Sequence, residues 1–88
     1  MESEYKKILL LSGLDQITEE ELQRFKFFVT DEFKISRSNL EDATNRTKLA
    51  DQLIQSAGPL SAVTKTIHIF RKLNYMHVAN CLQEAKKR

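Results

Sequence analysis

The sequence has few of the residues that interrupt or cross-link a chain. Among its 88 residues are one proline, two glycines, one cysteine and no tryptophan. So little proline and glycine disfavours a fold of many short strands and tight turns, and favours helices joined by short loops. The single cysteine, Cys81, excludes an internal disulfide, and we therefore expect a reducing compartment, the cytoplasm.

Long apolar runs are also missing. The ILLLSGL segment at residues 8–14 is far shorter than the roughly 20 residues of a membrane-spanning helix, and a charged stretch precedes it. We expect neither a signal peptide nor a membrane partner. With 41% hydrophobic and 30% charged residues, residues 1–88 are predicted to form one small globular domain.

The motifs of common enzyme classes are absent. The chain has no glycine-rich phosphate loop, no HExxH and no GxSxG. His68 and His77 lie on different expected helices without a pair of cysteines or acids at metal-ligand spacing around them, and Cys81 is interpreted as a partly buried structural thiol. The sequence thus predicts no enzyme, no metal site, no cofactor and no small-molecule substrate.

The two halves of the chain carry opposite charge. Residues 1–44 hold six Lys and Arg against ten Asp and Glu, a net charge of −4, whereas residues 45–88 hold eight against two, a net charge of +6. Such a division favours self-complementary assembly or contact with a polyanion.

The periodicity of apolar residues predicts helices throughout. We expect them at residues 3–11, 18–31, 45–57, 59–72 and 75–88, with a short turn of helix at 40–43 inside the polar connection 34–45. Thr18 with Glu21 forms a capping-box pattern. Gly13 is expected to end the first helix, Pro59 suits a first helical turn, and Asn74 is expected to cap the last helix.

The helix at 18–31 has one phenylalanine too many for a single apolar face. At about 100° per residue, Leu22, Phe25 and Val29 share the core face and Phe28 flanks it, while Phe27 falls on the opposite side. Single exposed apolar residues are common, but an exposed aromatic ring also suits the centre of an interface. Both interpretations stay open at this point.

The helix at 59–72 shows an apolar and a basic side. The expected core positions are Leu60, Val63, Ile67 and Phe70, and the basic side holds Lys65, His68 and Lys72, with Arg71 at its edge. The basic side is either a solvated face or a surface that meets the acidic start of helix 18–31 on another copy. Such a head-to-tail contact would build a helical filament. DNA contact is a less favoured interpretation, because apolar positions interrupt the basic residues and no nucleic-acid motif is present.

Three stretches identify a resemblance: MESEYKKILLLSGLDQITEEELQRFKFF, NRTKLADQLIQSAG and IFRKLNYM. Over essentially the whole chain the sequence resembles the pyrin domain of the PYHIN family. The resemblance implies an all-α death-fold bundle of six antiparallel helices, with a short third helix after a long loop. It also implies a domain without catalytic activity that binds other pyrin domains and forms filaments.

The resemblance further implies the partners. Sensors of this kind also carry a HIN domain that binds double-stranded DNA, which we do not find in this chain. Clustered on DNA, their pyrin domains nucleate filaments of the adaptor ASC, which activates caspase-1 in the inflammasome. A pyrin-only module that caps ASC or sensor filaments is the alternative.

Individual positions follow from the same resemblance. Phe27 of the FKFF run is expected to take part in self-association, and Leu10 and Leu11 are similar candidates. Periodicity places Leu10 away from the core if Leu9 faces it. The acidic surface would comprise Asp15, Glu19, Glu20 and Glu21, and its basic counterpart Lys26, Lys65, Arg71 and Lys72. Gln23 stands where the family pattern has an acid.

Overall fold

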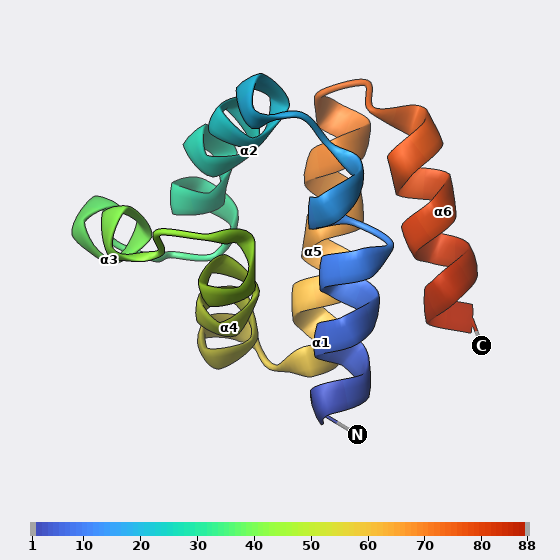
Figure 1. The fold of residues 1–88 in the computed structure, drawn as a ribbon, viewed down its shortest axis with the longest axis horizontal. Coiled ribbons are helices and arrows are strands. Elements are labelled where there is room, and N and C mark those ends of the chain that lie inside the picture. The colour runs from blue at the N-terminus through green and yellow to red at the C-terminus, as the bar shows by residue number, and fades with distance from the viewer. Residues whose placement is uncertain (1, 88) are drawn as a thin grey trace.

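The computed structural model describes residues 2–87, with side chains from residue 4 onward (Figure 1). These residues form α1 (Glu2–Leu11), the short 3-10 helix η1 (Leu14–Gln16), α2 (Glu19–Glu32), α3 (Arg37–Asp42), α4 (Arg46–Ala57), α5 (Pro59–Lys72) and α6 (Met76–Lys87). No strand occurs within that range. The predicted all-α, six-helix architecture is confirmed, although α3 begins three residues earlier than expected and η1 is not predicted.

Helix α5 lies at the centre of the bundle. It contacts α1, α2, α4 and α6, and Figure 1 shows it behind α1, between the α2–α4 side and α6. Its buried residues are Ala62, Val63, Thr66, Ile67, Ile69 and Phe70. Because helices surround α5 on several sides, only a narrow strip of its side chains faces solvent.

The predicted start of α2 is confirmed in detail. The Thr18 side chain accepts from the backbone N–H of Glu21 at 3.1 Å, and the Glu21 carboxylate accepts from the backbone N–H of Thr18 at 2.8 Å. These two bonds satisfy donors that helix geometry leaves unpaired. Asn45 caps α4 in a similar way, since its side chain accepts from the N–H of Lys48 at 2.8 Å.

Gly13 follows α1 as expected, but for a different reason. Its φ is −124°, so it does not adopt the left-handed conformation of a helix-ending glycine. A Cβ atom at this position would lie 2.6 Å from the backbone oxygen of Leu9 and 3.3 Å from a Leu82 methyl group. Glycine is required here because the chain passes close to α1.

The expected role of Asn74 is wrong. Asn74 has a φ of 66° and ends α5 instead of capping α6. The N–H of Tyr75 donates to the Phe70 carbonyl at 2.7 Å, and the N–H of Asn74 donates to the Arg71 carbonyl at 3.0 Å. This pair of bonds is a Schellman motif, in which asparagine can replace the usual glycine.

Two burial predictions are also wrong. Leu60 is 52% exposed, because it lies in the first turn of α5, before the first buried position of that helix. Cys81 is exposed, because α6 turns Val78, Ala79 and Leu82 toward the bundle and Cys81 lies on its outer side.

Candidate protein-interaction surfaces

Phe27 projects from the outer side of α2. Its side chain is 68% exposed, whereas Leu22, Phe25 and Val29 of the same helix are buried. Its ring lies edge-on to the half-buried Phe28, with 5.8 Å between ring centroids. The predicted exposure of Phe27 is confirmed, and removing this apolar surface from water would stabilise a contact with another molecule.

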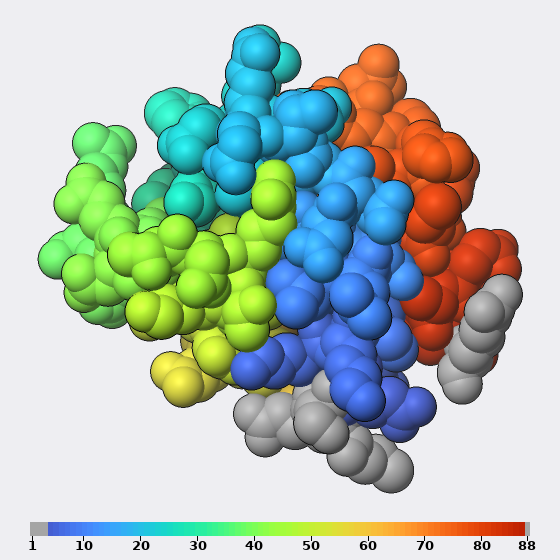
Figure 2. All heavy atoms as spheres, viewed as in Figure 1, coloured from blue at the N-terminus to red at the C-terminus, as the bar shows by residue number. Residues whose placement is uncertain are grey.

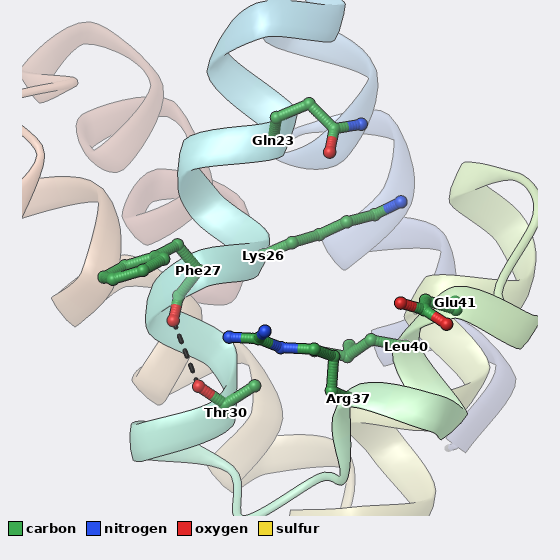
Figure 3. Close-up of a pocket in the computed structure, with 7 residues that line it drawn as sticks. All are labelled: Gln23, Lys26, Phe27, Thr30, Arg37, Leu40 and Glu41. Carbon is green, nitrogen blue, oxygen red and sulfur yellow. Dashed lines mark hydrogen bonds between the residues drawn. The ribbon is translucent and has the colours of Figure 1, made fainter.

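A groove of about 260 Å³ runs between α2 and α3, beside Phe27. It is lined by Gln23, Lys26, Phe27, Thr30, Arg37, Leu40 and Glu41 (Figure 3). Lys26 extends from α2 toward the side where Glu41 lies, and the Phe27 ring points the other way. In the space-filling view α3 stands at the left edge of the molecule, with a hollow between it and α2 (Figure 2).

The four predicted acidic residues gather around the start of α2, but they differ in whether other groups of the domain already bind their carboxylates. Glu21 is occupied by the capping box, and Glu20 pairs with Arg24 at 2.9 Å. Glu19 lies 3.6 Å from Arg46, and Asp15 is exposed on η1. Asp15, Glu19 and Glu20 therefore keep exposed side chains for a partner, at 79% for Glu19 and 78% for Glu20.

The two candidate leucines on α1 differ in burial. Leu11 is 58% exposed, while Leu10 is half-buried and packs against the core. The prediction that Leu10 points away from the core is wrong, because Leu11 is the residue opposite the fully buried Leu9. Of the two, Leu11 offers the larger apolar contact.

Two of the predicted basic residues are occupied inside the molecule. The Lys72 ammonium lies 2.7 Å from the Glu32 carboxylate, and Lys65 donates to the backbone oxygen of Glu32 at 2.9 Å. Lys65 also lies over the ring of Phe33, 5.7 Å from its centroid. Both lysines thus fasten the C-terminal end of α2 to α5, where cations suit the helix dipole.

Glu32 is the centre of this cluster. The hydrogen bond from Lys72 lowers the pKa of its carboxyl group; partial burial acts in the opposite direction, and the charges of Lys72, His68 and Lys65 lower it further. The His68 imidazole lies 4.0 Å from the same carboxylate. The carboxylate form is therefore the one that holds α2 and α5 together.

Arg71 and Lys26 keep outward positions. Arg71 is exposed and its guanidinium donates to the Gln83 side chain on α6, while Lys26 is half-buried at the groove beside Phe27. Neither forms an ion pair among the side chains of residues 4–87. These two cations can still form an ion pair with a carboxylate of a partner.

Sequence reasoning missed Glu32 and Arg46. Arg46 joins the start of α4 to the start of α2, since it donates to the Ile17 carbonyl at 2.9 Å and approaches Glu19. For Glu32 the available signal was the stripe of Lys65, His68 and Lys72 on α5, which turns three cationic or titratable groups to one side. The stripe alone does not reveal which acid lies opposite it.

Comparison with protein families decides the classification. The PAAD/DAPIN/Pyrin domain family model matches residues 8–80. The chain belongs to the pyrin domain family. This pyrin domain is a homotypic interaction domain of the death-fold type, and the family is not one of enzymes.

Individual relatives agree with this classification. The chain is 68% identical over 87 residues to interferon-inducible protein AIM2 of Mus musculus and 60% identical over 88 residues to that of Homo sapiens. These matches cover 99% and 100% of this chain but only 24% and 25% of the relatives, so the chain spans about a quarter of their length.

A solved structure is similar as well. The NMR solution structure of the AIM2 PYD from Mus musculus matches with a TM-score of 0.69 and 68% identity, over 99% of this pyrin domain and 90% of that chain. Within residues 2–87, no helix is long and apolar enough to cross a membrane.

Proposed function

We propose that this pyrin domain is a signalling-assembly module of the cytoplasm. It self-associates head-to-tail and nucleates filaments of the adaptor ASC, which leads to caspase-1 activation in response to cytosolic double-stranded DNA. DNA would be bound by a HIN domain in the full-length protein, and not by the pyrin domain itself. The similarity to AIM2 over the whole chain supports this proposal.

The exposure of Phe27 is the observation on which the mechanism rests. A ring that is 68% exposed contributes about 1.5–3 kcal/mol when an interface buries it. Leu11 adds a second exposed apolar side chain on α1. The groove beside Phe27 gives a partner a concave surface next to the ring.

Charge sets the orientation of the contact. Asp15 and Glu19 on one copy would approach Arg71 and Lys26 on another, with Glu20 and Glu21 adding negative potential. Exposed ion pairs contribute only about 0–1 kcal/mol each, so they direct the encounter more than they hold the complex. Lys65 and Lys72 are less available to a partner, because the backbone oxygen of Glu32 accepts from Lys65 and its carboxylate pairs with Lys72.

DNA would act as a scaffold for assembly. Several copies held on one duplex experience a high effective concentration, which replaces slow nucleation in solution. The pyrin domains would then present a ready-made filament end to ASC.

A seeding assay tests the proposal. Substoichiometric amounts of the chain, tethered at high density, are added to monomeric fluorescent ASC pyrin domain. We expect a shortened lag, and we expect Phe27→Glu to lose seeding by at least about tenfold, which corresponds to roughly 1.4 kcal/mol.

The matched control is Met76→Glu, which places the same charge at another exposed apolar side chain, 45% exposed on α6. It should retain most of the seeding. A lengthened lag with the unaltered chain would identify a capping inhibitor instead, and equal losses in both variants would refute Phe27 as the anchor.

A further inference from the structure

A shallow depression of about 170 Å³ lies between α5 and α6, away from Phe27. It is lined by Thr64, Ile67, His68, Arg71, Gln83 and Lys86. Two full cations and one histidine from two helices therefore border one small site. None of these residues belongs to the acidic surface or to the groove beside Phe27. Only Arg71 also takes part in the contact proposed above.

Neutral groups hold the two cations in place. Arg71 donates to the side-chain oxygen of Gln83, and the Lys86 ammonium donates to the Thr64 hydroxyl at 2.9 Å. Among the side chains of residues 4–87, neither cation lies within 4.0 Å of a carboxylate. An arginine has five N–H donors and a lysine three, so both keep donors for a ligand.

The carboxylate of Glu32, at the edge of the depression, is already engaged. Glu32 lies 4.0 Å from His68 at the edge of the depression, but it pairs with Lys72 at 2.7 Å. The potential in the depression is therefore positive. Both cations are oriented before any ligand arrives, which lowers the entropic cost of binding.

We propose that this depression binds a small phosphate-bearing anion of the oligophosphate class. The planar guanidinium of Arg71 matches two phosphate oxygens at once, and Lys86 supplies a point charge from the facing helix. One water occupies about 30 Å³ of liquid, so 170 Å³ corresponds to roughly five or six such groups, enough for one phosphate group, and the rest of an oligophosphate would extend out of the open depression. Because Arg71 and Lys86 border one small site, a compact anion can contact both cations at once, whereas carboxylates spaced along a partner helix cannot.

The site is open and has no phosphate-binding glycine loop, so we expect affinity in the millimolar range. Binding should weaken with salt, because exposed charges are screened within about 8 Å at physiological ionic strength. The proposal does not depend on filament assembly and is tested on the monomeric chain.

Inorganic pyrophosphate is the probe. It is titrated at constant ionic strength into the ¹⁵N-labelled chain, at a concentration where light scattering shows a monomer. We expect saturable shifts at the amides of residues 64–71 and 83–86. Arg71→Gln and Lys86→Gln should each weaken binding about two- to fivefold, the range for an exposed ion pair.

Lys48→Gln is the control, since it removes the same charge from an exposed position on α4. It should change the affinity by less than about 1.5-fold, below the range of one direct ion pair. Equal weakening by Lys48→Gln, or shifts spread over all exposed lysines, would overturn the proposal in favour of diffuse attraction. A short DNA duplex that shifts these amides where pyrophosphate does not would also overturn it.

Discussion

Glu32 shows how a single side chain limits which cations are available on the surface. Its carboxylate and its backbone oxygen occupy Lys72 and Lys65, so the predicted basic surface is smaller than the sequence suggests. Of the four predicted basic residues, Arg71 and Lys26 are left without an ion pair among the side chains of residues 4–87, and they lie on different helices. Charge complementarity between copies therefore depends on position as well as on net charge.

The Glu32 cluster makes stability depend on pH. Its pKa is lowered in the folded state, so its contribution is fully present above the unfolded value of about 4.3 and is lost as pH falls through the folded pKa. We expect Glu32→Gln to lower the free energy of unfolding at pH 7 by up to about 1 kcal/mol, because both partners are partly exposed and screened. Urea denaturation between about pH 7 and pH 3 measures this difference.

The difference in free energy of unfolding between Glu32→Gln and the unaltered chain should shrink toward zero as the pH approaches about 3. Asp31→Asn is the matched control, an exposed acid beside Glu32 that forms no ion pair among the side chains of residues 4–87. A Glu32→Gln deficit that persists unchanged at pH 3 would show that shape or hydrogen bonding, and not charge, holds the cluster.

At the scale of the element, the close passage of the chain past α1 fixes the residue at position 13. A Cβ added to Gly13 would lie 2.6 Å from the Leu9 backbone oxygen, and backbone atoms cannot rotate away as a flexible side chain can. We expect Gly13→Ala to destabilise the domain by about 1–3 kcal/mol, the usual cost of overpacking. Thermal unfolding should show a midpoint lowered by about 4–8 °C per kcal/mol.

Ser12→Ala serves as the comparison, because it changes the neighbouring residue without adding a Cβ. Its effect should stay within about 0.5 kcal/mol. Equal midpoints for Gly13→Ala and the unaltered chain would mean that the backbone at position 13 shifts away from the Leu9 carbonyl at no cost.

Helix starts and exposed faces were predictable from local signals. The capping box of Thr18 and Glu21, a signal only four residues long, marks the start of α2. The exposed position of Phe27 follows from periodicity along that same helix. Contacts between distant residues were not predictable. Glu32 meets Lys72 across 40 positions of sequence, and this pairing depends on the angle at which α2 crosses α5.

The misjudged residues also depend on neighbours. Leu60 has the right spacing for the core of α5, but it lies in the first turn, where no buried position precedes Ala62. Cys81 could be placed only after the side of α6 that packs on the bundle was known. Periodicity gives the faces of a helix, whereas tertiary packing decides which face is covered and over what length.

For the whole molecule, we propose that the division of charge and the exposed ring of Phe27 act together in assembly. The first half has a net charge of −4 and the second half +6, and both contribute to one rigid bundle around α5. In the proposed head-to-tail contact, the opposite signs of two copies would meet and Phe27 would be buried. A repeated contact of this kind makes assembly cooperative, because each added subunit meets a surface of fixed geometry.

Salt should separate the two contributions. Raising NaCl from about 0.15 M to 1 M shortens the screening length from about 8 Å to 3 Å. Two to four exposed ion pairs per subunit together correspond to roughly 1–3 kcal/mol, so we expect the critical concentration for assembly to rise about 5- to 150-fold. Sedimentation of the assembled fraction measures it.

Chloride is the appropriate anion, because sulfate would strengthen apolar burial and confuse the comparison. Urea denaturation at both salt concentrations must first show that the fold itself is unaffected. A critical concentration that does not change with NaCl would mean that apolar contacts at Phe27 and Leu11 account for assembly alone. The opposite charges of the two halves would then serve only to guide the first encounter between copies.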